Sequence, residues 1–188
     1  MDPRFLIGII GSLLLVIGSA LPDRSVSHPA KSRKNQFFAI GNACMFAYAL
    51  LGYLAGGPIF FVVLQIFIVL STLLMMLGTP DRFSTPLLSI AGFGLVGWAL
   101  ALFEGYGTAI FVIGLVLLGI GFALNAKAAK RAIFLSVGSA AIALFSLASR
   151  DWVFFVLNVF FTLFSGWHAV RLFLPAQSHV APETRPAA

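Results

Sequence analysis

Charged residues and cysteines are both scarce in this sequence. Asp, Glu, Lys and Arg make up 10% of the 188 residues, whereas a soluble domain carries roughly 25%. Hydrophobic residues reach 60%, so the composition places the chain among membrane proteins. The one cysteine, Cys44, excludes an internal disulfide and a cysteine-rich metal site. Its apolar surroundings predict a buried, inert thiol.

Long apolar runs, by contrast, are abundant. Seven of them have about the length that crosses a bilayer, and Arg171 lies near the end of the last. Because lipid offers no hydrogen-bond partners to the backbone, each run is predicted to be a helix, in an all-α transmembrane fold. The predicted spans are 5–21, 37–55, 58–77, 84–103, 108–124, 132–148 and 152–173.

The first run has two interpretations. Arg4, the apolar core and the small residues 18–20 imitate a cleavable signal peptide. However, residues 10–21 match residues 113–124 at eight of twelve positions. A disposable signal has no reason to copy an internal segment, so we expect a retained helix.

That match is the first part of an internal repeat. The second run resembles the sixth, with Gly41 opposite Gly138, and residues 58–65 resemble residues 151–158. One unmatched helix between two three-helix units gives both units the same orientation, a 3+1+3 plan of parallel repeats. We therefore expect the following segments: 1–77, first repeat; 78–106, linker helix; 107–173, second repeat; 174–188, disordered cytosolic tail.

The net charge of +6 is distributed over short loops, which argues against a nucleic-acid partner. With the N-terminus outside, the outer loops hold two cations, Arg4 and Arg150. The inner loops and tail hold ten, namely Arg24, Lys31, Arg33, Lys34, Arg82, Lys127, Lys130, Arg131, Arg171 and Arg185. Because cytoplasmic loops carry an excess of Lys and Arg, we expect the N-terminus outside and the C-terminus in the cytosol.

Gln65 and Asn158 are side-chain amides at equivalent places in the two repeats. Each is followed seven residues later by a hydroxyl, Thr72 or Ser165, which falls on the same helix face. A buried amide needs a partner. One interpretation is a hydrogen bond that fastens two helices. The other, which the pairing favours, is a solute site where the two repeats meet.

Further candidates for this site lie on the second and sixth runs. Asn42 and Tyr48 are about 120° apart on one helix, so both cannot point at the same axis. Ser139 is the repeat mate of Asn42, and Phe145 is that of Tyr48. We therefore predict a chemically asymmetric substrate-binding pocket of Gln65, Asn158, Tyr48, Asn42, Ser139, Thr72 and Ser165.

None of the seven predicted spans contains Asp or Glu. Proton-driven carriers usually hold an intramembrane carboxylate, so proton coupling is disfavoured. An intramembrane hydrolase lacks its acid–base pair or metal cluster. We therefore expect no enzyme, no cofactor and no bound metal. Glycine motifs at 92–97 and 52–56 are interpreted as small residues for close helix packing rather than nucleotide binding.

The chain resembles the SWEET and semiSWEET sugar facilitators (the MtN3 or PQ-loop clan), closest to a bacterial inner-membrane branch of the YgjV type. The resemblance covers residues 5–173 and rests on Tyr48-Ala-Leu-Leu-Gly52, then Pro58-Ile59, then Gln65. It implies that Tyr48 takes the place of a substrate-stacking Trp. It also implies that Gln65 and Asn158 take the places of paired pocket Asn residues.

Two functions follow as expectations. The first is a multi-pass facilitator of a small polar solute, sugar-like or vitamin-like, in the bacterial inner membrane, working by alternating access. The second is a non-transporting membrane protein that serves as a scaffold or accessory subunit. The expected partners are the lipid bilayer and a small-molecule solute, and a homo-oligomer stays open.

Overall fold

The computed structural model describes residues 2–22, 28–124 and 129–173. Within these ranges the chain forms seven α-helices and one short 3-10 helix, η1. The helices are α1 (Pro3–Ala20), α2 (Arg33–Leu54), α3 (Phe60–Met76), α4 (Asp81–Ala101), α5 (Tyr106–Ala123), α6 (Ala129–Ala148) and α7 (Trp152–Phe173), and η1 is Pro29–Lys31. The predicted tail 174–188, together with Arg24, Lys127 and Arg185, lies outside the described residues.

Each helix coincides with one of the seven apolar runs, so the all-α prediction is confirmed. Three helices begin several residues before the predicted span: α2 at Arg33, α4 at Asp81 and α6 at Ala129. The helical hydrogen-bond ladder continues through these polar starts, because hydropathy marks a length of apolar surface and not the backbone conformation. Hydrophobicity therefore identified the helices correctly but placed three of their starts too late.

Six of the seven helices are long and apolar enough to cross a membrane, and α3 is the exception. It is apolar but has 17 residues, which is the lower end of the range that spans about 30 Å of hydrocarbon. Large apolar side chains are exposed along the other helices, as with Phe93 at 78% and Leu163 at 69%. The architecture is therefore compatible with a multi-pass membrane protein.

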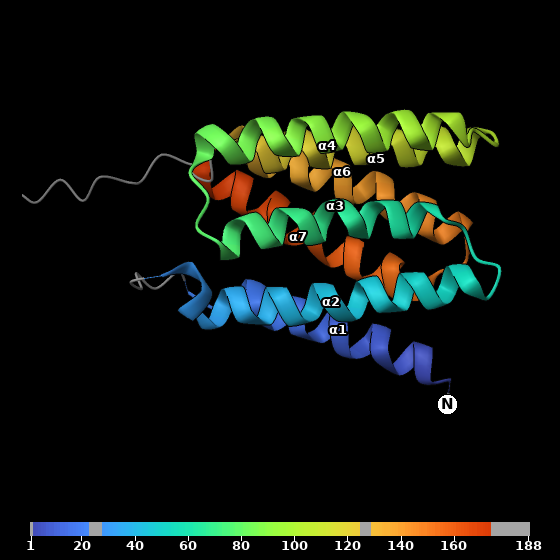
Figure 1. Ribbon diagram of the computed structural model, residues 1–188, viewed down its shortest axis with the longest axis horizontal. Helices are drawn as coiled ribbons and strands as arrows, with labels where there is room; N and C mark the ends of the chain where they lie inside the picture. The colour runs from blue at the N-terminus through green and yellow to red at the C-terminus, as the bar shows by residue number, and fades with distance from the viewer. Residues whose placement is uncertain (1, 23–27, 125–128, 174–188) are drawn as a thin grey trace, which may run out of the picture.

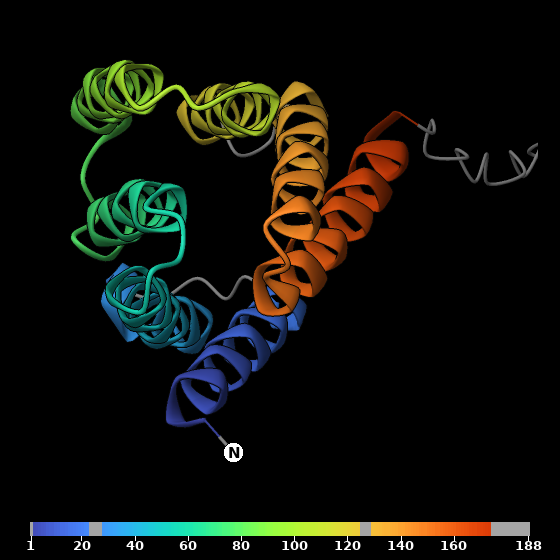
Figure 2. The same cartoon turned by 90° about the vertical axis from the view of Figure 1, so that its right-hand side faces the viewer.

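The helices run side by side, and consecutive helices contact each other from α1 to α7 (Figure 1). Contacts between α7 and α1 close the ring, which is seen end-on in Figure 2. A further contact joins α3 to α5, inside the position of α4. The ring brings α3 and α7 to face each other across its interior, although the sequence separates them by about half the chain.

The α1–α2 and α5–α6 pairs close on glycines in the same way. A Cβ on Gly11 would lie 3.1 Å from the Gly41 carbonyl oxygen, and a Cβ on Gly138 would lie 3.1 Å from the Gly114 carbonyl oxygen. Leu15 covers Gly41 just as Leu118 covers Gly138. The two helix pairs therefore share one packing scheme, glycine by glycine.

The glycines of α4 do not pack in this manner. A Cβ added to Gly94 or Gly97 would meet no atom within 4 Å, and the same holds for Gly52 and Gly56 on and after α2. The prediction that these glycines allow close packing against another helix of the same chain is therefore wrong for these four positions. Among the six long helices α4 is the least buried, because only α3 and α5 flank it and most of its surface points away from the ring.

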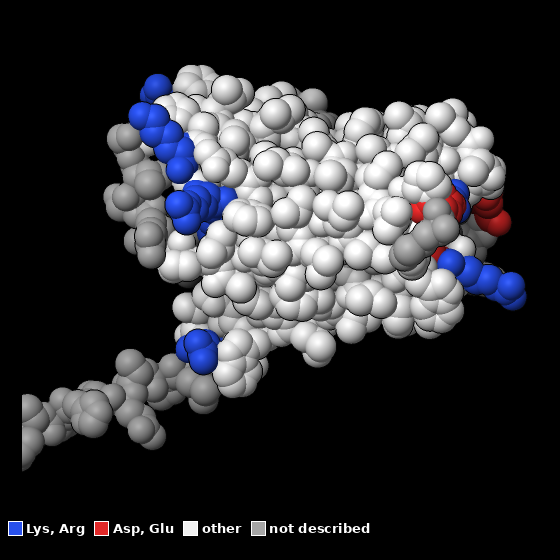
Figure 3. All heavy atoms as spheres, turned by 90° about the horizontal axis from the view of Figure 1, so that it is seen from below, with Lys and Arg blue, Asp and Glu red and all other residues white. Residues whose placement is uncertain are grey.

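The two ends of the ring differ in charge (Figure 3). The basic end, as we call it, carries the side chains of Lys31, Arg33, Lys34, Arg82, Lys130, Arg131 and Arg171. The acidic end carries Asp2, Glu104 and Asp151 together with Arg4 and Arg150. The described cations therefore segregate strongly toward one end of the bundle.

Candidate functional site

The two predicted amides are buried, but their hydrogen bonding differs. Gln65 on α3 is 2% exposed, and its Oε1 atom accepts no hydrogen bond from the described chain. Asn158 on α7 is 7% exposed and donates from Nδ2 to the Phe154 carbonyl oxygen of its own helix at 2.8 Å. The amides are thus neither lipid-facing nor bonded to each other. Among the described residues, Gln65 Oε1 is the one fully buried side-chain nitrogen or oxygen atom without a hydrogen-bond partner.

Asn42 and Thr72 fasten α2 to α3. The Asn42 Nδ2 atom donates to Thr72 Oγ1 at 2.7 Å, and Thr72 Oγ1 in turn donates to the Ile68 carbonyl oxygen at 2.9 Å. Both side chains are buried. The predicted pair of Gln65 and Thr72 does share the face of α3, but this hydroxyl is already committed to a structural bond.

Within the described residues, no matching bond joins Ser139 to Ser165, the positions that the predicted repeat pairs with Asn42 and Thr72. Ser139 is buried on α6, and Ser165 is half-buried on α7. The side-chain bond that joins α6 to α7 comes instead from Ser136, whose Oγ donates to the Thr162 carbonyl oxygen at 2.9 Å. The predicted asymmetry of the interior therefore extends from side-chain type to hydrogen bonding.

Four rings form what we call the aromatic layer: Tyr48, Phe61, Phe145 and Phe154. Phe61 and Phe154 stack with centroids 4.4 Å apart and planes 6° apart. Tyr48 lies 5.7 Å from Phe154, and Phe145 lies 5.3 Å from Phe61. The two tilted contacts lie within the range of about 4.5–7 Å that is favourable for ring pairs, and the stacked contact is slightly closer. The layer thus joins the pair α2 and α3 to the pair α6 and α7, and these two pairs are not consecutive in the chain.

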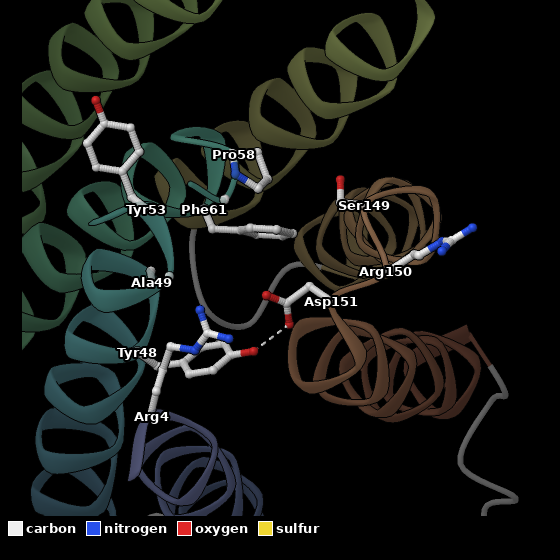
Figure 4. A pocket seen from close by; sticks show the side chains of 11 residues that line it. Arg4, Tyr48, Ala49, Tyr53, Pro58, Phe61, Ser149, Arg150 and Asp151 are labelled. Atoms are coloured by element: carbon white, nitrogen blue, oxygen red, sulfur yellow. Dashed lines mark hydrogen bonds between the residues drawn. The ribbon is translucent and has the colours of Figure 1, made fainter. Parts of the chain in front are cut away.

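A cavity of about 190 Å³, which we call the Asp151 pocket, lies at the acidic end next to this layer (Figure 4). Phe61 belongs to both the layer and the pocket lining. The complete lining is Arg4, Tyr48, Ala49, Gly52, Tyr53, Gly57, Pro58, Phe61, Ser149, Arg150 and Asp151. Of the seven predicted site residues, this pocket includes Tyr48 and none of the other six.

The local sequence explains why Asp151 points into this pocket. After α6 ends at Ala148, Arg150 adopts a φ of 58°, and the Asp151 backbone N–H donates to the Ser146 carbonyl oxygen at 2.9 Å. Asp151 immediately precedes α7, and its Oδ1 accepts from the Phe154 backbone N–H at 3.1 Å. This is an N-cap, which satisfies one of the free N–H groups of a helix start.

The same carboxylate connects the two halves of the chain. Tyr48 on α2 donates its hydroxyl to Asp151 Oδ1 at 3.0 Å. Figure 4 shows the other carboxylate oxygen directed into the pocket. A bond to an ionised acceptor is stronger than a neutral one, so Tyr48 and Asp151 hold α2 and the start of α7 together across the acidic end.

Two arginines border the pocket with opposite orientations. The guanidinium of Arg4, near the start of α1, points into the pocket, whereas that of Arg150 points away from it (Figure 4). Arg4 Nε lies 3.5 Å from Asp2 Oδ2, with side chains 37% and 54% exposed. An exposed pair of this kind is weak, so the Arg4 charge is available to other partners.

Sequence reasoning missed Arg4 and Asp151 as pocket residues. Arg4 was assigned only as a charge of the outer loops, and the predicted site consists of polar groups within the apolar runs, which do not include Asp151. One signal was present: Asp151 directly precedes an apolar run, where an N-cap is expected. That pattern predicts a helix start, but the partner of its second oxygen depends on which helices meet there.

The described ranges contain no group of three or more His, Cys, Asp or Glu side chains placed to hold a metal ion. No family model, no curated protein and no solved structure matches this chain. Function is therefore argued from the geometry of the pocket, the aromatic layer and the buried amides.

Proposed function

We propose that this protein is a multi-pass membrane facilitator that carries a small polar solute across the bilayer by alternating access. A solute entering at the acidic end would reach the Asp151 pocket, then the aromatic layer, then the amides of Gln65 and Asn158. The described conformation is closed at the layer, since Phe61 and Phe154 stack in contact.

The observation that carries this proposal is the unpaired oxygen of Gln65 behind the aromatic layer. Gln65 lies one helical turn beyond Phe61, which lines the pocket, and one turn corresponds to about 5.4 Å along the helix. Leaving a buried acceptor without a partner costs about 1–3 kcal/mol. A solute hydroxyl or amine bound at this level would supply the missing donor.

The matched contacts of the two halves support a rocking motion of two parallel three-helix repeats. The repeat relates Phe61 to Phe154, and these mates contact each other. It also relates the Tyr48–Phe154 contact to the Phe145–Phe61 contact. Together with the shared glycine packing of α1–α2 and α5–α6, these pairs favour a pseudo-two-fold axis through the aromatic layer.

The segregation of charge supports an orientation with the basic end in the cytosol and the N-terminus outside. In that orientation the Asp151 pocket faces the outside. We also propose the plan of the SWEET clan and a bacterial inner-membrane location, in keeping with the motif at Tyr48, Pro58 and Gln65.

Uptake into liposomes tests this function. The purified chain would be reconstituted and assayed with labelled small solutes, first as wild type and then as Gln65→Ala and Asn158→Ala. Ser89→Ala on α4 is the matched control, because that hydroxyl bonds only the Thr85 carbonyl oxygen of its own helix. We expect uptake by wild type and the control, and a loss of at least about 10-fold in Gln65→Ala, the equivalent of about 1.4 kcal/mol.

The alternative is a non-transporting scaffold or accessory subunit. It is favoured by the Asn42–Thr72 bond and by the Asn158 bond to its own helix, since both polar groups are satisfied within the protein. No uptake of any assayed solute by a well-folded wild-type chain would favour this alternative. Unchanged uptake in both amide variants would leave transport standing but remove Gln65 and Asn158 from its mechanism.

A further inference from the structure

We infer that the Asp151 pocket is a binding site for a small zwitterion with the charges of an α-amino acid. The zwitterion would be the substrate class of the proposed facilitator. That role rests on the proposed function, because it requires the pocket to lie on the solute path. It begins from two opposite charges, Arg4 from the start of α1 and Asp151 from the start of α7. Both point into one cavity (Figure 4).

The carboxylate of Asp151 has one oxygen in use and one available. Both of its hydrogen bonds, from the Tyr48 hydroxyl and the Phe154 backbone N–H, are received by Oδ1. These bonds fix the orientation of the side chain, so that the other oxygen is held toward the cavity. A negatively charged hydrogen-bond acceptor that is held in place on a cavity wall favours the binding of an ammonium group.

Arg4 supplies the complementary group for a carboxylate. Its guanidinium extends toward the cavity in Figure 4, and its exposed pair with Asp2 is long at 3.5 Å. The planar fork of an arginine binds a carboxylate through two parallel hydrogen bonds. A ligand carboxylate would therefore compete well against this weak surface pair.

The remaining lining sets the size and polarity of the rest of the ligand. Besides the two charged groups, the lining includes the small residues Ala49, Gly52 and Gly57 and the apolar ring of Phe61. The volume of about 190 Å³ equals that of roughly six water molecules in the liquid and lies below the range of about 300–1,000 Å³ for drug-sized ligands. A short aliphatic side chain fits this space.

Other small polar solutes fit these charges less well. A neutral sugar would leave both Arg4 and Asp151 without an opposite charge after displacing their water, which is unfavourable. A simple anion would be repelled by Asp151, and a simple cation by Arg4. A molecule that carries both charged groups on one carbon atom, as an α-amino acid does, satisfies both walls of the pocket at once.

Calorimetric binding to the purified full-length chain tests this site. The probes are L-alanine, L-alaninamide (which lacks the carboxylate), N-acetyl-L-alanine (which lacks the ammonium) and D-glucose. The variants are Arg4→Gln and Asp151→Asn. Asparagine retains the capping oxygen for Tyr48 and Phe154, so Asp151→Asn removes charge with little effect on folding. The matched control is Arg150→Gln, whose guanidinium points away from the cavity and makes no proposed ligand contact.

We expect L-alanine to bind most tightly. Each single-charge probe should bind about 10- to 100-fold more weakly, because it lacks one charge-assisted hydrogen-bonded pair with the pocket. Arg4→Gln should weaken the binding of L-alanine by a similar factor but strengthen that of L-alaninamide, because the repulsion between Arg4 and this cation is removed. Asp151→Asn should weaken the binding of L-alanine but strengthen that of N-acetyl-L-alanine, because the repulsion between Asp151 and this anion is removed. Arg150→Gln should behave as wild type.

Three outcomes overturn the inference: no binding of L-alanine, binding of D-glucose at equal strength, or equal losses in Arg4→Gln and Arg150→Gln. The liposome assay separates this result from the proposed function. Uptake of another solute without L-alanine binding would refute the zwitterion site alone. Binding of L-alanine with no uptake of any solute would refute transport and leave the site in place.

Discussion

Phe61 of α3 and Phe154 of α7 stack with centroids 4.4 Å apart and planes 6° from parallel. Each ring is followed, one helical turn later, by an amide: Gln65 behind Phe61 and Asn158 behind Phe154. The amides differ in their bonding, because Asn158 is bonded to the Phe154 carbonyl oxygen whereas the Gln65 oxygen has no partner in the described chain. This difference between two positions that the predicted repeat pairs makes the roles of the two amides separable by mutation.

Gln65→Met should stabilise the protein. Methionine has a similar shape, and the change removes an unsatisfied buried acceptor that costs about 1–3 kcal/mol. We expect the free energy of unfolding in detergent to rise by about 1 kcal/mol, as measured by denaturant titration. Asn158→Leu is the comparison and should lower the free energy of unfolding by about 0.6 kcal/mol, since a satisfied amide is lost. A fall in stability for Gln65→Met would contradict the geometry of the unpaired oxygen.

Tyr48→Phe should loosen the acidic end. The substitution keeps the ring in the aromatic layer and removes only the hydroxyl that donates to Asp151 Oδ1 at 3.0 Å. We expect a loss of about 1–2 kcal/mol in unfolding free energy, typical of a hydrogen bond to a charged group. Tyr53→Phe is the control, because Tyr53 is 43% exposed and should change stability by less than about 0.5 kcal/mol. Equal effects of the two substitutions would show that the Tyr48–Asp151 bond contributes nothing.

Asn42 and Thr72 should be energetically coupled. Their 2.7 Å hydrogen bond joins α2 to α3, and such bonds in membrane proteins average about 0.6 kcal/mol, with a maximum near 1.7. A double-mutant cycle of Asn42→Ala and Thr72→Ala measures this coupling directly. Additive effects of the two substitutions would rule out the bond as a fastener.

Gly138→Ala should be strongly destabilising. The added Cβ would lie 2.9 Å from the Leu118 backbone nitrogen, which cannot move without shifting α5. Overpacking of this kind costs about 1–3 kcal/mol. Gly97→Ala is the matched control, because nothing lies within 4 Å of its added Cβ and alanine favours a helix by up to about 1 kcal/mol. The midpoint temperature of thermal unfolding should therefore fall for Gly138→Ala and should rise or stay unchanged for Gly97→Ala.

Phe61→Ala should open the aromatic layer. Phe61 is 3% exposed and lines the Asp151 pocket, and the next turn of α3 carries Gln65. We expect faster or leakier solute uptake in liposomes, with a stability loss of about 3–5 kcal/mol for a buried Phe. Phe67→Ala on the same helix is the control, since Phe67 is buried at 0% but contacts Phe122 on the α5 side. Loss of uptake in both variants alike would assign Phe61 to packing rather than to gating.

Much of the fold was predictable because lipid exposure forces a simple rule on the backbone. A run of apolar residues long enough to span hydrocarbon must be helical, so all seven helices were found from hydropathy. The burial of Gln65, Asn158, Asn42 and Ser139 was also expected from their place within apolar runs. Helix starts at Arg33 and Asp81 were missed, since hydropathy does not report where hydrogen bonding begins.

Which residues contact each other between helices was not predictable from the sequence. Thr72 shares a helix face with Gln65 as expected, yet it bonds Asn42 of α2 because α2 packs against that face. Gly94 and Gly97 satisfied a small-residue motif, but no helix covers them. The same residue spacing is compatible with a packed or a bare face, and only the position of the neighbouring helices distinguishes the two.

The sequence by itself determined an all-helical chain of seven apolar segments with its basic residues gathered at alternate loops, because those properties depend on composition and on local spacing. The tertiary structure decided that Tyr48 meets Asp151, 103 residues away, and that Phe61 stacks on Phe154. Contacts of this range depend on the order of helices around the ring and on the rotation of each helix about its axis. Both are set by the packing of all seven helices together.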